Sequence, residues 1–337
     1  MNEPFLFVVG SGRSGTTLLR AMLDAHPDLT IPGESYFIEQ MARRRDGFRV
    51  EGRFDREAFE AELFADLRFQ AWNLAPDAVR AELDRQPPAD LADAIRGTYR
   101  AAARRMGTTR WGDKTPSYAL CVPTIAALLP ESVFVHLVRD PRDVAASYAR
   151  AGWGPRSMTA AGHAWRSRVA AATAAGRALG PSRYLEVRYE DLVAEPRTQL
   201  EAICRLVELA FDPRMLDYRD GPVVRRSLGM EAGAHTALIA PPTVGLRDWR
   251  TDLTDAEAAR VGAITDRTAT GFGYPPSPAV RGMNRWRSGV ERAAGTVERA
   301  SLAFRRTRLA NRLRGPWRRL RGRATLEQLG IPAEGVT

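Results

Sequence analysis

The residues most able to do chemistry lie near the start of the chain. The segment Gly10-Ser11-Gly12-Arg13-Ser14-Gly15-Thr16-Thr17 follows an apolar run, 5–9, and precedes an amphipathic stretch, 18–25. Glycines let the backbone fold tightly and direct its N–H groups into a concavity. A helix that begins there adds free amides and the positive end of its dipole. The order strand, glycine-rich turn and helix therefore predicts an anion-binding loop, although such a turn can also be purely structural.

The cation in this loop is an arginine and not the usual lysine. Gly10 and Gly15 have the spacing of a nucleoside triphosphatase loop, but Thr16 stands where that loop has its lysine. Without the lysine, the loop is poorly equipped to hold a β,γ-phosphate pair with magnesium. Arg13 can still grip a terminal oxyanion at two oxygens.

Glu34 and Lys114 are candidates for acid–base and charge-stabilising roles. Glu34 follows a short predicted strand, 29–32, and ligands of open α/β sheets bind beyond the ends of strands. A helix cap is the alternative role for Glu34. Lys114 is the single lysine among 50 basic residues, and lysine offers a compact charge and a transferable proton that arginine lacks. The alternative is that Lys114 has no special role and is present by chance in an arginine-biased composition.

A second apolar strand, 132–138, ends at Arg139. Pro141 can begin a helix that runs through residue 148, so Arg139 is expected beside a helix N-terminus, with Ser147 about two turns along that helix. His136 lies within the apolar run, which is more typical of a core histidine than of a catalytic base.

The polar residues around this helix start have simpler expected roles. Asp140 and Asp143 are expected to be helix caps and not acids, and Arg142 to be a surface residue on the first turn. The segment 189–191, Tyr-Glu-Asp, is expected to be structural.

Alternating strands and helices predict an α/β fold with a mostly parallel central sheet covered on both faces, like that of P-loop nucleoside triphosphate hydrolases. Residues 184–189 form a further predicted strand. Helices are expected over 54–69, 91–106, 122–129, 151–180, 196–208 and 254–268, and residues 213–250 are expected to be loop.

The expected organisation is one catalytic domain and a tail. Residues 1–278 would form the domain, with a helical insertion at 36–105, and residues 279–337 a basic tail that is helical or partly disordered. Residues 281–323 carry fourteen arginines against Glu291 and Glu298, so this stretch accounts for the whole-chain charge of +10. The rest of the chain is not a basic nucleic-acid binder. The tail could lie on an anionic membrane surface, dock on an acidic partner or be solvated.

Composition narrows the class of protein further. With 44% hydrophobic and 27% charged residues, the chain is an ordinary globular protein. Cys121 and Cys204 have no metal-ligand spacing and are expected to be free thiols in a reducing compartment. The acidic start and the lack of a long apolar run favour a cytoplasmic bacterial enzyme, and association with a membrane through its tail is an open alternative.

Together these segments resemble the P-loop sulfotransferases, which use 3′-phosphoadenosine 5′-phosphosulfate (PAPS). The loop from Gly10 to Leu19, the segment 135–143 and Ser147 carry this resemblance. The run 13–27 is especially similar to the tyrosylprotein sulfotransferase branch and its bacterial relatives, and the resemblance covers about residues 4–275.

The resemblance implies a role for each of these residues. Arg13 and its loop would hold the 5′-phosphosulfate, and Arg139 with Ser147 the 3′-phosphate. Glu34 matches the glutamate taken as catalytic base, and Lys114 a lysine proposed to stabilise the transferring sulfuryl group and the leaving phosphate. The loop residues implied in PAPS binding are Ser11, Gly12, Arg13, Ser14, Gly15, Thr16 and Thr17.

A later segment, 243–249, is reminiscent of the part of the family that closes over the cofactor, which implicates Thr243, Gly245 and Arg247. It departs from the cytosolic pattern of the family. The implied reaction is an in-line displacement at sulfur by a hydroxyl or amine, without a metal ion. The acceptor could be a small molecule, glycan, lipid or peptide.

Two other functions stay open at this point. A P-loop small-molecule or nucleotide kinase would share the loop, but Thr16 and the lack of a recognisable magnesium aspartate after an apolar strand disfavour it. A catalytically silent nucleotide-binding module is disfavoured because Arg13, Glu34 and Lys114 are all present.

Overall fold

A computed structural model describes residues 3–151, 154–220 and 248–278. The chain divides into the units 1–279 and 280–337, and the second unit lies outside the described residues. The fold below is therefore that of the first unit alone.

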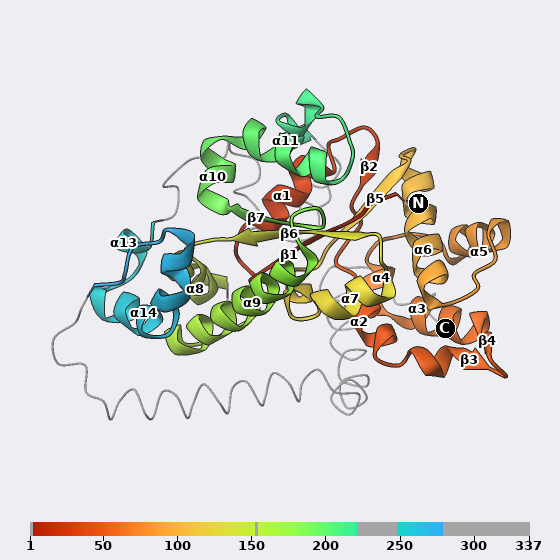
Figure 1. Cartoon of the computed structure of the whole chain (residues 1–337), viewed down its shortest axis with the longest axis horizontal. Helices are drawn as coiled ribbons and strands as arrows, with labels where there is room; N and C mark the ends of the chain where they lie inside the picture. Colours follow the sequence, from red (N-terminus) through yellow and green to blue (C-terminus); the bar gives the residue numbers. More distant parts are fainter. Residues whose placement is uncertain (1–2, 152–153, 221–247, 279–337) are drawn as a thin grey trace, which may run out of the picture. The chain divides into compact units, whose positions relative to one another are not determined.

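A five-stranded parallel sheet forms the centre of this unit (Figure 1). Its strands are β1 (Phe5–Gly10), β2 (Leu29–Thr30), β5 (Arg110–Lys114), β6 (Ser132–Val138) and β7 (Tyr184–Arg188), in the spatial order β2-β5-β1-β6-β7. The chain leaves β1 for strands on one side and later returns to strands on the other. This reversal creates a crevice at the carboxyl ends of the strands, where ligands of such sheets bind. The predicted α/β fold with a mostly parallel sheet is confirmed.

Helices cover both faces of the sheet. One face carries α1 (Thr16–Leu23), α10 (Tyr189–Ala194) and α11 (Pro196–Leu206), and the other carries α7 (Val122–Leu128) and α9 (Met158–Leu179) (Figure 1). The central strand β1 is buried throughout because it feeds two cores. Phe5, Phe7 and Val9 belong to one core, and Leu6 and Val8 to the other. This explains why the strand reads as a continuous apolar run.

The insertion between β2 and β5 is mainly helical. It contains α2 (Phe37–Ala42), α3 (Arg56–Ala65), α4 (Leu67–Gln70), α5 (Pro76–Arg85), α6 (Leu91–Met106) and a 3-10 turn, η1 (Arg45–Phe48). The sequence pattern did not predict its two-residue strands β3 (Arg49–Val50) and β4 (Arg53–Phe54), which form a short antiparallel hairpin. It also merged α3 and α4, which Asp66 separates by capping the start of α4.

The remaining elements surround the carboxyl edge of the sheet. A 3-10 turn, η2 (Pro116–Leu120), follows β5, and α8 (Pro141–Ala151) follows β6. Two further turns, η3 (Pro213–Met215) and η4 (Tyr218–Asp220), follow α11. The last described elements are α13 (Trp249–Asp252), α14 (Asp255–Ala269) and η6 (Thr270–Phe272). The helix α14 confirms the one expected over 254–268, and Thr254 and Glu257 form a capping box at its start.

Within the described ranges, no helix combines the length and apolar character that crossing a bilayer requires.

The structure can be tested at Trp165, which ties α9 to the edge of the sheet. Its ring is fully buried, and its Nε1–H donates to the Arg139 carbonyl oxygen over 2.9 Å. Trp165→Phe keeps an aromatic ring but leaves that carbonyl without this donor, so we expect the free energy of unfolding to fall by about 1–3 kcal/mol. Ser167→Ala, on the exposed face of the same helix, should change it by less than about 0.5 kcal/mol. Equal effects in denaturant titrations would contradict this role for Trp165.

Candidate active site

The register of the parallel strands brings the predicted site residues to one edge. Val8 of β1 pairs with Lys114 at the end of β5, and Gly10 pairs with Leu137 of β6, two residues before Arg139. The glycine loop, Lys114 and Arg139 therefore all lie at the carboxyl ends of neighbouring strands. Glu34, which follows β2, reaches the same place, because its carboxylate contacts Lys114.

The glycine loop has the backbone of an anion cradle. Arg13 and Gly15 have φ angles of 69° and 91°, in the left-handed region, and α1 begins directly afterwards without a side-chain cap. A Cβ on Gly15 would lie 2.3 Å from the Tyr189 ring, and one on Gly12 would lie 2.3 Å from the Tyr148 hydroxyl. A side chain at either position would displace an aromatic ring of α8 or α10 that packs directly against the loop, and Gly15 is also left-handed.

The hydroxyls of the loop include one that suits an oxyanion ligand. Ser14 is fully buried, and its Oγ has no hydrogen-bond partner among the described residues. A buried hydroxyl without a partner is costly, and a ligand oxygen would satisfy it. Ser11 and Thr16 are also buried, whereas Thr17 is half-buried. The loop therefore fits an anionic group such as the phosphosulfate end of PAPS.

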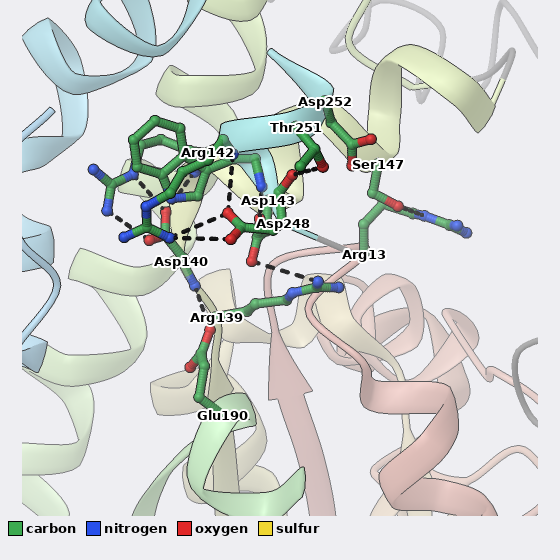
Figure 2. Close-up of polar contacts among 12 residues, drawn as sticks. Arg13, Arg139, Asp140, Arg142, Asp143, Ser147, Glu190, Asp248, Thr251 and Asp252 are labelled. Carbon is green, nitrogen blue, oxygen red and sulfur yellow. Dashed lines mark hydrogen bonds and ion pairs between the residues drawn. The ribbon is translucent and has the colours of Figure 1, made fainter. Parts of the chain in front are cut away.

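Arg13 reaches from the loop to α8. Its Nε donates to the Ser147 Oγ over 3.0 Å (Figure 2). The resemblance assigned Arg13 to the 5′ end and Ser147 to the 3′ end of the nucleotide. The structure brings these two residues into direct contact, so the side chains expected at the two ends of the nucleotide adjoin each other here.

Arg139 follows β6, and Figure 2 shows its guanidinium beside Asp143. It is buried, its guanidinium lies 3.5 Å from an Asp143 carboxylate oxygen, and it stacks over the Tyr189 ring at 4.4 Å. A guanidinium positioned by an aromatic ring and a carboxylate is suited to grip a phosphate at two oxygens.

Asp143 does not act as the expected cap of its own helix. Its Oδ1 accepts the backbone N–H of Trp249 over 2.7 Å, which fastens α13 to α8. Burial raises the pKa of Asp143 to about 6, although the neighbouring Arg139 acts in the other direction. The carboxylate therefore serves as a link between two elements.

The prediction for Arg142 was wrong. It was expected on the surface, but the residue is buried, with 1% of it exposed. Its guanidinium forms two hydrogen bonds with Asp140, at 2.9 and 2.6 Å, and lies 4.2 Å from the centre of the Trp249 ring. Asp140 also accepts the Arg142 backbone N–H, as a cap would. The charge is buried because a carboxylate and an aromatic face surround it.

Glu34 and Lys114 form an ion pair with a Nζ–Oε1 distance of 2.7 Å. Lys114 is buried, and the Glu34 side chain is 26% exposed. Burial by itself raises the pKa of Glu34, but Lys114, with smaller contributions from Tyr36 and Arg68, outweighs it and lowers the pKa below its usual value. Glu34 is therefore ionised at neutral pH and can accept a proton, and Lys114, the chain's single lysine, brings its ammonium group to the same point.

His136 and Glu190, both expected to be structural, make contacts that fit this role. His136 is fully buried, and its Nδ1 lies 2.7 Å from the Tyr184 hydroxyl, well inside the sheet. Glu190 accepts the Asp140 backbone N–H and the Tyr274 hydroxyl, so it joins α10 to the end of β6. Sequence reasoning missed Tyr36, Tyr148 and Trp249, because a single aromatic residue carries no recognisable motif.

Part of the expected site lies outside the described residues, namely Thr243, Gly245 and Arg247. Within the described ranges, no group of three or more His, Cys, Asp or Glu side chains could hold a metal ion.

Known proteins match this chain over most of its described length. A family model with the description "Sulfotransferase family" matches residues 4–213. Nodulation protein NoeE of Sinorhizobium fredii is 29% identical over 280 residues, which cover 76% of this chain and 62% of that protein. Protein-tyrosine sulfotransferase 2 of Gallus gallus is 26% identical over 64% of this chain, which spans only 54% of that protein.

Two solved structures share the fold. The sulfotransferase domain of the olefin synthase from Synechococcus PCC 7002 is 28% identical, with a TM-score of 0.57 over 81% of this chain and 95% of that domain. The sulfotransferase domain from the curacin biosynthetic pathway has a TM-score of 0.58 at 22% identity, over 82% of this chain and 99% of that domain.

Asp113, next to Lys114, should make the stability of the folded protein depend on pH. It is fully buried and accepts the Tyr99 hydroxyl over 2.7 Å, and burial raises its pKa to about 6 from 3.8. Between these pH values the folded protein binds more protons than the unfolded chain, so this group makes stability fall as pH rises, by about 3 kcal/mol in total. We expect Asp113→Asn to lose that component of the slope in denaturant titrations from pH 4 to pH 7. The same slope in both proteins would contradict the assignment.

Proposed function

The chain belongs to the sulfotransferase family, and from this premise we propose that it transfers the sulfuryl group of PAPS to a hydroxyl or amine of an acceptor. The observation that carries the proposal is the convergence of six side chains at one sheet edge. Arg13 contacts Ser147 of α8, Asp143 of the same helix holds Arg139, and Glu34 pairs with Lys114. In this arrangement Arg13 and Arg139 can each bind one anionic end of a nucleotide. Glu34 supplies a base beside the Lys114 cation.

The proposed chemistry follows from where charge develops. The acceptor oxygen or nitrogen attacks sulfur, and the bond between sulfur and the bridging phosphate oxygen breaks. Adenosine 3′,5′-bisphosphate leaves with that oxygen. Arg13, the amides of the glycine loop and Lys114 stabilise the negative charge that grows there, because they are already oriented before the reaction.

Glu34 is the proposed base. Its carboxylate takes the proton that the acceptor loses as the new bond to sulfur forms. Because its pKa is lowered, it is in the proton-accepting form throughout the neutral range. Lys114 then has a second task, since it also balances the charge of the carboxylate before the acceptor binds.

The acceptor is proposed only as a class: a small molecule, glycan, lipid or peptide. We also propose a cytoplasmic location, with the basic segment 281–323 as a contact for an anionic membrane or an acidic partner. A P-loop kinase is the competing function. Thr16 in place of the loop lysine disfavours it, because that lysine positions the β- and γ-phosphates.

Ligand selectivity separates the two functions. We expect adenosine 3′,5′-bisphosphate to bind more tightly than ATP with magnesium in calorimetric titrations, and EDTA to leave the bisphosphate affinity unchanged. Arg13→Ala should weaken bisphosphate binding roughly 10- to 100-fold, the effect of losing a charge-assisted contact. Arg177→Ala, which removes an exposed arginine of α9, is the control and should have no such effect. Tighter binding of ATP with magnesium would reject the sulfotransferase proposal.

The catalytic pair can be tested by two substitutions that keep its shape or charge. Glu34→Gln removes the proton acceptor and should lower kcat by about 100-fold or more. Lys114→Arg keeps the positive charge but not the compact ammonium group, and we expect a loss of at least about tenfold in kcat with PAPS binding retained. Steady-state assays with labelled PAPS measure both effects. Wild-type kcat in Lys114→Arg would show that any cation suffices at this position.

A further inference from the structure

The Asp143 carboxylate lies between Arg139 and α13 and contacts each with a different oxygen (Figure 2). Its Oδ2 lies 3.5 Å from an Nη atom of Arg139, four residues earlier in the chain. Its Oδ1 accepts the backbone N–H of Trp249, the first residue of α13, over 2.7 Å. The Asp143 side chain is only 12% exposed. A single, largely buried carboxylate thus joins a proposed phosphate-binding arginine to an element more than a hundred residues later.

Two further contacts fasten α13 to α8, and neither involves this carboxylate. The Arg142 guanidinium lies 4.2 Å from the centre of the Trp249 ring, and both residues are buried. Near the last residues of the two helices, Arg150 forms an ion pair with Asp252 over 2.8 Å. Because these contacts set the place of α13, the Trp249 N–H can in turn fix the direction of the carboxylate that it bonds.

Arg139 has two other contacts of a different kind. Its backbone carbonyl accepts the Trp165 Nε1–H over 2.9 Å, which holds the main chain, and its guanidinium stacks over the Tyr189 ring at 4.4 Å. A stacked ring sets the plane of a guanidinium but permits the group to turn within that plane. A carboxylate oxygen beside Nη restrains this turn, because the N–H groups of arginine point in fixed directions. Asp143 therefore supplies a directional contact that the ring cannot supply.

We propose that Asp143 is a positioning residue for Arg139: α13 fixes the carboxylate, and the carboxylate holds the guanidinium in the orientation that binds a 3′-phosphate. This inference rests on the proposed function, in which Arg139 binds that phosphate. Asp143 acts through Arg139 and needs no contact with the nucleotide. A guanidinium that is already oriented loses less conformational freedom when the ligand binds, so the benefit is seen as affinity for the 3′-phosphate.

The negative charge of Asp143 makes positioning distinguishable from a simple effect of charge. A carboxylate near a phosphate repels it, so removing the charge alone would strengthen binding of the bisphosphate. Loss of a positioned guanidinium would weaken that binding. Asp143→Asn removes the charge but keeps an oxygen that can accept the Trp249 N–H. The sign of the change in affinity therefore decides between the two effects.

Calorimetric titrations at pH 8 with adenosine 3′,5′-bisphosphate and adenosine 5′-monophosphate test the proposal. Burial raises the pKa of Asp143 to about 6, so the carboxylate is ionised at this pH. We expect Asp143→Asn to reduce the wild-type preference for the bisphosphate about fivefold, with the monophosphate affinity unchanged.

Asp252→Asn is the matched control, because it makes the same chemical change in another ion pair between α8 and α13. A partly exposed ion pair contributes little, so this variant should change the preference by less than about twofold. An unchanged or increased preference in Asp143→Asn, or an equal loss in Asp252→Asn, would overturn the proposal.

A second readout needs no nucleotide. In ¹⁵N-labelled protein, the NMR signals of the Arg139 guanidinium, assigned with Arg139→Lys, report how fast the group turns about its Cζ–Nη bonds. Turning should be at least about fivefold faster in Asp143→Asn than in the wild type or Asp252→Asn, because the ion-pair partner that hinders it is gone. Equal rates in the wild type and Asp143→Asn would overturn the positioning role. If the wild type binds the bisphosphate no better than the monophosphate, the proposed function fails, whereas these signals still decide whether Asp143 orients Arg139.

Discussion

The parallel pairing of β1 with β5 and β6 is the constraint on which the site depends. Parallel strands end on the same side of a sheet, so the residues that follow them must meet. The pairs Val8–Lys114 and Gly10–Leu137 set how far each strand extends at that edge. A slip of one residue in either pairing would turn buried side chains to the opposite face. The hydrophobic cores on the two faces of β1 therefore also fix the positions of the charged groups.

Burying these charges is possible because each has a partner of opposite sign or an aromatic face. Lys114 is paired with Glu34, Arg139 lies between Asp143 and Tyr189, and Arg142 is bonded to Asp140. Burying an isolated charge would cost roughly several kcal/mol, so an unpaired group would shift its pKa and become neutral. The pairing keeps the cations oriented before a ligand arrives, which is what stabilisation of a developing oxyanion requires.

The sequence predicted the parts of this architecture that depend on local pattern. The apolar strands β1 and β6, the glycine loop and the helix α14 all follow from residue types at fixed spacing. Strand β5 was missed, because Asp113 and Lys114 interrupt its apolar character. These two polar residues are tolerated there by partners that are distant in the sequence, Tyr99 and Glu34.

Tertiary contacts account for the remaining differences. Arg142 reads as a surface residue on a first helical turn, but it is buried, and the Trp249 ring that packs against its guanidinium comes from more than a hundred residues away. The left-handed backbone of Tyr36 has no sequence signal at all, because its cause lies in hydrogen bonds to the segment after β5. Pattern thus predicts which elements exist, and packing decides which side chains they present to the site.

The central claim is that this edge recognises a nucleotide through two separate phosphate groups, one of them held by Arg139. The most direct measurement is calorimetric titration with adenosine 3′,5′-bisphosphate and with adenosine 5′-monophosphate, in the wild type and in Arg139→Ala. The wild type should prefer the bisphosphate by about tenfold or more, and Arg139→Ala should abolish that preference while binding of the monophosphate is unchanged. A preference that survives in Arg139→Ala, or equal affinities in the wild type, would contradict the account.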